Sequence, residues 1–111
     1  MQLIKFLNKL FIEDGFILID AERNRYIIGS PIKKNPIIIK LLDKELHHKL
    51  LLNPDLYFGE GYVEGTIKIE NGTLTEFLDL AFRNIGRSEI NTFLKILKQI
   101  KGTYRYLTNF N

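Results

Sequence analysis

Residues 54–65 read Pro-Asp-Leu-Tyr-Phe-Gly-Glu-Gly-Tyr-Val-Glu-Gly and hold three of the eight glycines in the chain. Aromatic rings lie among these glycines, beside positions where only glycine takes a positive φ or lets two backbones approach closely. Because a proline opens the stretch and an alternating strand pattern follows it, we interpret it as a rigid corner. Its rings would anchor that turn against the core.

The spacing of these glycines is close to that of dinucleotide-binding turns, which follow a strand and open a helix. Neither neighbour fits. Residues 66–70 alternate as a strand, and Glu60 and Glu64 would place negative charge beside a pyrophosphate. The stretch is therefore not predicted to bind phosphate.

Composition favours one domain that works in a reducing compartment. The chain has 111 residues, 45% of them hydrophobic, which is enough for a single packed core. It has no cysteine, so it offers neither a disulfide nor a thiolate metal ligand. No apolar run is long enough to cross a bilayer, and lysines interrupt the N-terminal residues too often for a signal peptide. We expect a cytoplasmic protein, soluble or peripheral to the inner face of the membrane.

Charge is distributed unevenly along the chain. Lys and Arg outnumber Asp and Glu by nine to six in residues 1–50 and by six to one in residues 81–111, whereas residues 51–80 have one against six. Two basic ends therefore flank an acidic middle. Such ends suit an anionic membrane surface or solubility alone. The basic residues lack the glycine and aromatic signature of nucleic-acid binding, so we expect no nucleic-acid partner.

Hydrophobic periodicity changes repeatedly between the helical and the strand pattern, which indicates the α+β class. The predicted helices cover residues 2–13, 43–52, 73–85 and 88–101, and the predicted strands cover residues 16–20, 25–29, 37–42 and 66–70. Asp43, and Thr73 together with Glu76, supply N-terminal helix caps. We expect a small, mostly antiparallel sheet covered by helices, in a single domain over residues 1–102.

Four lysines are candidates for contact with an anionic membrane. Lys5 and Lys9 lie opposite the apolar stripe of the first predicted helix, an arrangement that suits either packing on the sheet or lying at a membrane interface. Lys33 and Lys34 lie in a loop bounded by two prolines, where they would contact lipid phosphates or solvent.

The two predicted C-terminal helices carry apolar side chains at helical spacing, and four of these are candidates for contact with an acyl chain. They are Phe77 and Phe82 on the first helix, and Phe93 and Leu97 on the second. Side chains with this spacing either fill a core or line an apolar pocket.

Catalytic and metal sites are not predicted. His47 and His48 are adjacent and point to different sides of their helix, unlike two metal ligands that are four residues apart. No cysteine or paired acidic cluster is placed for catalysis. No strand leads into a glycine-rich turn and helix that would hold a nucleotide-like cofactor.

With this order of elements, the chain resembles the N-terminal domain of cyclopropane-fatty-acyl-phospholipid synthases over about residues 3–85. The most specific part is Leu-Leu-Asn-Pro-Asp-Leu at 51–56 followed by Gly-Glu-Gly-Tyr-Val-Glu-Gly at 59–65. It is similar to the family's leucines and proline before Gly-Glu-Ala-Tyr-Met-Asp-Gly, with mild departures at residues 61, 63 and 64. The residues that mark the family in this corner are Pro54, Gly59, Glu60, Tyr62 and Gly65.

The resemblance implies a fold similar to sterol-carrier-type lipid-binding domains. In the family, the full enzyme transfers a methylene group from S-adenosylmethionine to a cis double bond of a membrane phospholipid chain, and a C-terminal methyltransferase domain performs this chemistry. This chain would then hold no catalytic residue and no cofactor. Its aromatic residues 103–111 would be the tail or linker that leads to that missing domain. The chain would be either a fragment of a larger protein or a free-standing relative.

Three functions follow as expectations. The first is a non-catalytic accessory domain that docks the enzyme on phospholipid or organises its catalytic domain. The second is a free-standing carrier that holds an acyl chain between the sheet and the two C-terminal helices. The third is a structural module that pairs two copies of the chain. Glu60 is expected to cap a turn, to pair with Arg83 or Arg87, or to face the catalytic domain.

Overall fold

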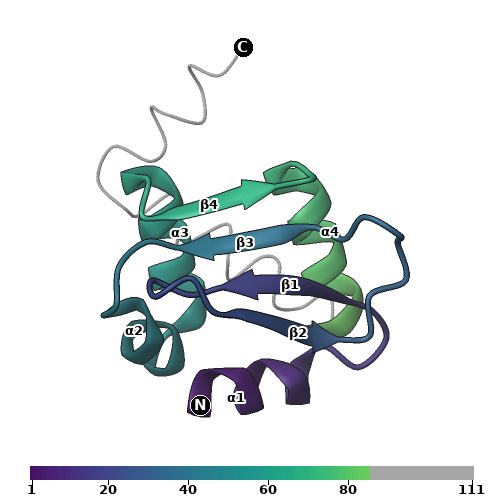
Figure 1. Ribbon diagram of the computed structural model, residues 1–111, viewed down its shortest axis with the longest axis horizontal. Helices are drawn as coiled ribbons and strands as arrows, with labels where there is room; N and C mark the ends of the chain where they lie inside the picture. Colours follow the sequence, from purple (N-terminus) through teal and green to yellow (C-terminus); the bar gives the residue numbers. More distant parts are fainter. Residues whose placement is uncertain (86–111) are drawn as a thin grey trace.

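The computed structural model describes residues 1–85, in which four helices lie on one face of a four-stranded sheet (Figure 1). The elements are α1 (Gln2–Leu10), β1 (Gly15–Ile19), β2 (Arg25–Gly29), β3 (Ile38–Leu41), α2 (Leu46–Leu52), α3 (Pro54–Glu64), β4 (Ile67–Glu70) and α4 (Leu74–Ile85). The predicted α+β class is therefore confirmed. The helix predicted over residues 88–101, with Phe93 and Leu97, and the tail 103–111 lie outside the described residues.

The sheet has the strand order β2-β1-β3-β4 and is mostly antiparallel, as predicted. β1 and β2 form the expected hairpin, with Phe16 opposite Ile28 and Leu18 opposite Tyr26. β3 lies parallel to β1, because the chain leaves β2, passes around the end of the sheet and returns on the far side of β1 (Figure 1). β4 completes the sheet, antiparallel to β3.

Every second side chain of the strands points toward the helices, and these side chains form the core. Phe16 and Leu18 of β1, Ile39 and Leu41 of β3, and Ile67 of β4 are buried on this face. Burial of such a side chain stabilises the fold by about 1.5–3 kcal/mol. The hydrophobic alternation that predicted the strands is therefore the same pattern that builds the core.

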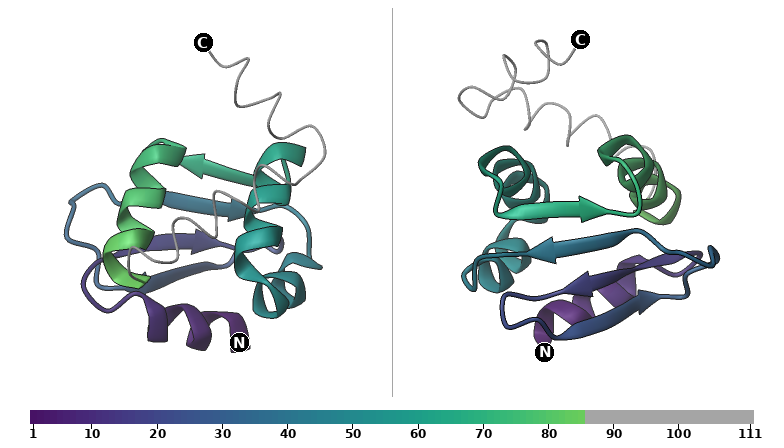
Figure 2. Two further views of the ribbon diagram at one scale, coloured as in Figure 1. Left: turned by 180° about the vertical axis from the view of Figure 1, so that it is seen from behind. Right: turned by 45° about the horizontal axis from the view of Figure 1, so that its top comes forward.

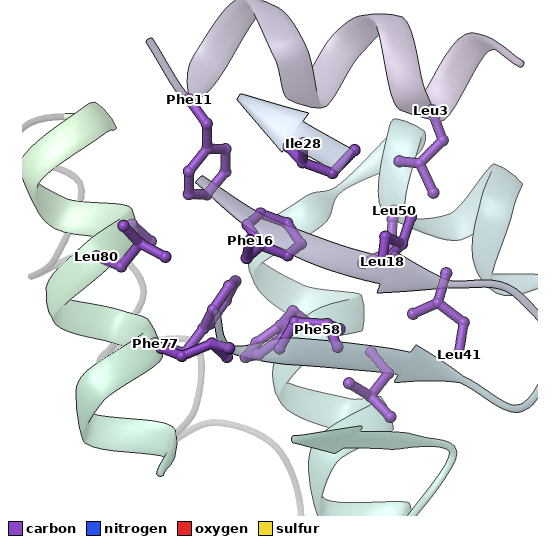
Figure 3. Close-up of a cluster of buried hydrophobic side chains, with 14 of the residues drawn as sticks. Leu3, Phe11, Phe16, Leu18, Ile28, Leu41, Leu50, Phe58, Phe77 and Leu80 are labelled. Atoms are coloured by element: carbon purple, nitrogen blue, oxygen red, sulfur yellow. The ribbon is translucent and has the colours of Figure 1, made fainter. Parts of the chain in front are cut away.

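Four phenylalanine rings connect the helices to this sheet (Figure 3). Phe77 of α4 lies at their centre, with its ring centroid 5.1 Å from that of Phe16 and 5.2 Å from that of Phe58. Phe11, between α1 and β1, lies 4.9 Å from Phe16 and 6.3 Å from Phe77. Edge-to-face and offset contacts at these distances add to the burial energy.

The opposite face of the sheet carries no helix from the described part of the chain (Figure 2). Ile17 is shielded there by Ile27 and Ile38, which are its neighbours across the two adjoining strands. Ile27 itself is 66% exposed. On the same face Lys40 and Glu70 form an ion pair with 3.0 Å between Nζ and a carboxylate oxygen. The core therefore lies between the sheet and the helix layer.

Residues 54–64 are a helix, so the predicted corner is wrong for most of its length. Pro54 opens α3, because a proline in the first turn of a helix needs no partner for an N–H group. The Asn53 side chain caps this helix by accepting the Leu56 N–H at 3.3 Å. Only Gly65 is a corner, since it has φ 85° and ends the helix in the left-handed conformation.

Gly59 and Gly61 are buried within α3, where the helix lies against the sheet. A Cβ atom at Gly61 would lie 2.7 Å from the Ile67 side chain of β4. Glycine inside a helix costs about 1 kcal/mol relative to alanine, and at Gly61 it leaves the room that Ile67 occupies. The glycines of this stretch therefore serve two purposes: Gly61 provides space and Gly65 provides a backbone angle.

Two other helix boundaries differ from those predicted. α1 ends at Leu10 and not at residue 13, because Phe11 leaves the helix and enters the core. Asp43 accepts the Glu45 N–H at 3.0 Å and forms a turn, whereas α2 begins only at Leu46. In both places an interaction outside the helix accompanies the shifted boundary: Phe11 enters the core after α1, and the Asp43 turn precedes α2.

The hairpin turn between β1 and β2 is built around the buried carboxylate of Asp20, which is 5% exposed. This carboxylate accepts the backbone N–H groups of Glu22 at 2.9 Å and Asn24 at 2.8 Å. It also accepts the Asn24 side-chain amide at 3.2 Å and the Tyr26 hydroxyl at 3.3 Å. Burial raises the pKa of Asp20, but these hydrogen bonds outweigh it and leave the pKa below its ordinary value of 3.8.

The Asp20 turn predicts a pH-dependent contribution to stability. Since the folded pKa lies below the unfolded one, the ionised carboxylate stabilises the fold above about pH 4, and this contribution is lost as pH falls through the folded pKa. We expect Asp20→Asn to lower the free energy of unfolding by about 1–2 kcal/mol at neutral pH. Urea unfolding at several pH values should show the gap between the two proteins narrowing below about pH 4. A gap independent of pH would contradict this.

The two purposes of the glycines predict losses of different size from one substitution. Asparagine tolerates the left-handed conformation, so we expect Gly65→Asn to cost less than about 1 kcal/mol. At Gly61 the same side chain would overlap Ile67, so we expect Gly61→Asn to cost about 1–3 kcal/mol. Urea unfolding of both variants measures the difference. Equal losses would show that both positions need glycine for the same reason.

Candidate functional site

An apolar groove of about 360 Å³ lies over the sheet on its helix side. Its lining comes from the helices and from two central strands. The lining side chains are Phe6, Leu7 and Leu10 of α1; Leu50 of α2; Pro54, Asp55 and Phe58 of α3; Phe77, Leu78, Ala81 and Phe82 of α4; Phe16, Leu18, Ile39 and Leu41 of β1 and β3; and Phe11 between α1 and β1. Figure 3 shows several of these rings converging on the space between the helices.

The chemistry of this lining is almost entirely hydrophobic. Among the described lining residues, Asp55 in the first turn of α3 is the one that carries charge. A groove of this size is within the range of small-molecule sites, which are about 300–1,000 Å³. Its surface offers burial to an apolar ligand and few hydrogen-bonding groups to orient a polar one. The arrangement therefore suits a hydrocarbon chain better than a sugar, a nucleotide or a peptide backbone.

The α4 wall is held in place at its C-terminal end by polar contacts to the segment between α1 and β1. The Asn84 side-chain oxygen accepts the backbone N–H groups of Glu13 at 2.8 Å and Asp14 at 3.3 Å. The Arg83 guanidinium lies 3.6 Å from the buried carboxylate of Asp14. That carboxylate also accepts the N–H of Ile32 at 3.0 Å. These contacts join α4 to the segment between α1 and β1.

The other end of α4 is fixed by the capping box that its sequence predicted. The Thr73 hydroxyl accepts the Glu76 N–H at 3.1 Å, and the Glu76 carboxylate accepts the Thr73 N–H at 3.0 Å. This reciprocal pair satisfies two backbone groups at the start of the helix. The capping box therefore sets where the helix that carries Phe77 and Phe82 begins.

Phe77 and Phe82, two of the predicted acyl-contact residues, both line the groove. Their environments differ. Phe77 is 7% exposed and belongs to the aromatic cluster, so it has a structural role in addition to any contact with a ligand. Phe82, one turn beyond Leu78, is half-buried and contributes more of its surface to the open groove. The other two candidates, Phe93 and Leu97, lie outside the described residues.

Several lining residues were not predicted as candidates from the sequence. Phe58 was expected to anchor a corner, but it stacks on Phe77 as part of α3. Phe6, Leu7 and Leu10 were expected to pack on the sheet or lie on a membrane, and they form a groove wall. The width of the apolar stripe on α1, which Phe6 extends, was a signal that this helix presents more apolar surface than packing on one strand requires.

The four predicted membrane-contact lysines fall on two separate elements. Lys5 and Lys9 are exposed one turn apart on α1, the helix whose apolar side lines the groove. Lys33 and Lys34 are exposed in the loop between β2 and β3. Lys33 lies 3.7 Å from the Glu76 carboxylate, which offsets part of its charge. Only the first pair is on an element of the groove.

Glu60 lies half-buried on α3, one residue before Gly61. Its predicted role in capping a turn is wrong, because residues 54–64 are a continuous helix. Its predicted pairing with Arg83 is also wrong, since Arg83 contacts Asp14 at 3.6 Å and Asp79 at 3.7 Å. The remaining alternatives, Arg87 and a further domain, lie outside the described residues.

Among the described lining residues, Asp55 is the one titratable side chain. Within residues 1–85, no group of three or more His, Asp or Glu side chains is arranged to hold a metal ion. His47 and His48 lie on α2 and do not line the groove, and the buried Nε2 atom of His47 has no hydrogen-bond partner in the described structure. Burial is thus the main interaction that this site offers a ligand.

Comparison of the chain with protein-family models, with curated proteins and with solved structures finds no match. None of the helices in the described part of the chain combines the length and the apolar character needed to cross a bilayer. The geometry and chemistry of the groove are therefore the basis for a functional assignment.

Proposed function

We propose that this chain is a non-catalytic lipid-binding domain that holds part of a phospholipid acyl chain in the groove between α1, α3 and α4. The observation that carries the proposal is the groove itself, about 360 Å³ in volume and lined by aromatic and aliphatic side chains. Each methylene group that moves from water into such a lining gains about 0.8 kcal/mol. A segment of about eight methylenes would gain roughly 6 kcal/mol, from which the cost of association is subtracted.

The resemblance of residues 51–65 to the family motif supports a specific setting for this activity. The chain would accompany a methyltransferase domain similar to that of cyclopropane-fatty-acyl-phospholipid synthases, which acts on acyl chains of membrane phospholipids. S-adenosylmethionine and the chemical step would belong to that domain. This chain would bring the enzyme to the inner face of the membrane, or present a lipid chain to it, with a fold similar to sterol-carrier-type domains.

A free-standing carrier is the variant of this proposal that uses the same groove. Both variants require an acyl chain to enter between the helices, and they differ in what the chain is attached to. Variants of the groove lining therefore test both functions together. Whether lipid binding requires vesicles distinguishes docking on a membrane from transport of single lipids.

A charge in the groove wall tests acyl-chain binding. We expect Phe82→Asp to weaken the binding of a fluorescent fatty acid by about tenfold or more. The reason is that a carboxylate in an apolar groove loses its hydration when an acyl chain covers it. Thr75→Asp puts the same charge on the exposed side of α4 and should leave binding unchanged. Circular dichroism confirms that both variants fold. Equal binding by both variants, or no lipid retained by the wild-type protein in native mass spectrometry, would contradict the proposal.

The lysine pairs predict which face meets an anionic membrane. Lys5→Gln with Lys9→Gln should reduce co-sedimentation with phosphatidylglycerol vesicles about tenfold or more, since each lysine near an anionic surface contributes about 1 kcal/mol. Lys33→Gln with Lys34→Gln removes the same formal charge from a loop away from the groove wall, and should have a smaller effect. Neutral vesicles and high salt should abolish the difference. A larger loss in the loop variant would place the membrane face elsewhere.

A further inference from the structure

We infer that two copies of this chain pair along the β4 edge of the sheet, with Ile69 opposite its own copy and Lys68 opposite the second copy's Glu70. The two strands would be antiparallel about a two-fold axis. Two features of β4 carry this inference: the backbone groups that it turns away from the sheet, and the charges beside them. The consequence for lipid binding rests in addition on the proposed function.

The two edges of the sheet differ in how far the rest of the fold closes them. β2, at one edge, lies beside α1, and the Asn8 side chain of that helix accepts the Gly29 N–H at 2.7 Å. β4, at the other edge, has β3 as its one strand neighbour in the described part of the chain (Figure 1). An unpaired strand edge is a template for another strand. β4 is therefore the edge to which a second chain can add.

The hydrogen bonds to β3 show which backbone groups of β4 point outward. Leu42 donates its N–H to the Thr66 carbonyl at 2.8 Å, and the two strands pair in register from there. Backbone groups alternate in direction along a strand, so those of the even-numbered residues point to β3 and those of Ile67 and Ile69 point outward. Within residues 1–85, these outward groups have no hydrogen bond. Ile67 is 1% exposed whereas Ile69 is half-buried, so Ile69 is the residue that a second strand can reach.

The charges on either side of Ile69 favour a second copy as the occupant. Lys68 lies directly opposite Lys40 of β3, and like charges in this position destabilise a sheet. Glu70 lies 3.0 Å from Lys40, and none of the ion pairs formed within residues 1–85 includes Lys68. The edge thus carries an exposed lysine and, two residues away, an exposed glutamate. Such an edge is complementary in charge to an antiparallel copy of itself.

One register satisfies both the backbone and the charges. Directly opposed residues of antiparallel strands point to the same face, so a two-fold axis at this edge passes through a residue. With the axis at Ile69, this residue exchanges its two hydrogen bonds with its copy, and Lys68 faces the second copy's Glu70 in the closer, non-hydrogen-bonded type of pair. An axis at Lys68 or at Glu70 would place like charges opposite each other. An axis at Ile67 would need a residue that is already covered.

Charge reversal tests this register in the full-length protein. We expect the wild-type protein to form a weak dimer in sedimentation velocity between about 10 µM and 1 mM, since an interface of one short strand is small. Lys68→Glu and Glu70→Lys should each weaken it about tenfold, because each turns two attractive pairs into two repulsive ones. An equal mixture of the two variants should dimerise again, since each then supplies the charge that the other lacks.

Lys44→Glu is the matched control for Lys68→Glu. It makes the same change in net charge on an exposed turn outside β4 and should leave the dimer unchanged. Circular dichroism checks that each variant folds. A protein that stays monomeric at the highest concentration overturns pairing at β4, and so does a mixture that associates no better than either variant alone. Slow exchange of the Ile69 amide proton in the dilute monomer also overturns it, because the edge would then be paired within one chain.

Pairing about this axis would place both grooves on the same side of the joined sheets. The axis is perpendicular to the sheet, so the helix layers of the two copies lie on one face. A dimer would then meet one membrane with two acyl-chain sites, and the second binding event would be intramolecular. We expect the mixture of Lys68→Glu and Glu70→Lys to bind phosphatidylglycerol vesicles about tenfold more tightly than the mean of the two variants measured separately. Oleate binding per chain should be unchanged.

The proposals fail in different ways. If the mixture dimerises without a gain in vesicle binding, the two-site contact with the membrane is wrong while pairing at β4 stands. If the mixture dimerises and oleate does not bind to any of these proteins, the proposed function is wrong while pairing at β4 stands. If oleate binds and the mixture does not dimerise, pairing at β4 is wrong while the proposed function stands.

Discussion

The contact on which the rest of the structure depends is the meeting of Phe77 with three other phenylalanine rings. Phe11 comes from the junction of α1 and β1, Phe16 from the sheet and Phe58 from α3, and their centroids lie 5.1–6.3 Å from that of Phe77. Each pair adds about 0.5–1.5 kcal/mol to the energy of burial. One side chain thus links the sheet to elements that are far apart in the sequence. The positions of α1, α3 and α4 follow from these contacts.

The groove is a consequence of how those helices are held. α1 packs near β2, α3 packs on β4 through Gly61, and α4 is held at its C-terminal end by Asn84 and Arg83. These three helices are therefore held by the sheet or by a loop, and α2 contacts both α1 and α3 (Figure 2). The space between them is lined mainly by aromatic and aliphatic side chains, the same types that fill the core. A fold of this kind combines a rigid aromatic base with an apolar opening, which is what binding a hydrocarbon chain requires.

Local signals predicted the elements whose hydrogen bonds are local. The hairpin has the expected strands, and the capping box at Thr73 forms as its sequence indicated. Residues 54–65 show where such signals fail. Glycines beside aromatic rings are typical of a turn, yet Gly61 lies within a helix, where it leaves room for Ile67 of the next strand. Nothing in residues 54–65 alone distinguishes a glycine needed for its φ angle from one needed for its size.

By itself, the sequence determined the α+β class, the order of most elements and the candidate residues Phe77 and Phe82, because periodicity and capping act within a few residues along the chain. Only the tertiary structure decided that α3 is a helix, that Phe6, Leu7 and Leu10 line one groove together with Phe82, and that Arg83 contacts Asp14 and not Glu60. The physical reason is that the groove and the Arg83–Asp14 contact join residues separated by dozens of positions, and that α3 packs on a strand outside its own sequence. They depend on the distances at which helices pack on the sheet, and no local pattern encodes those distances.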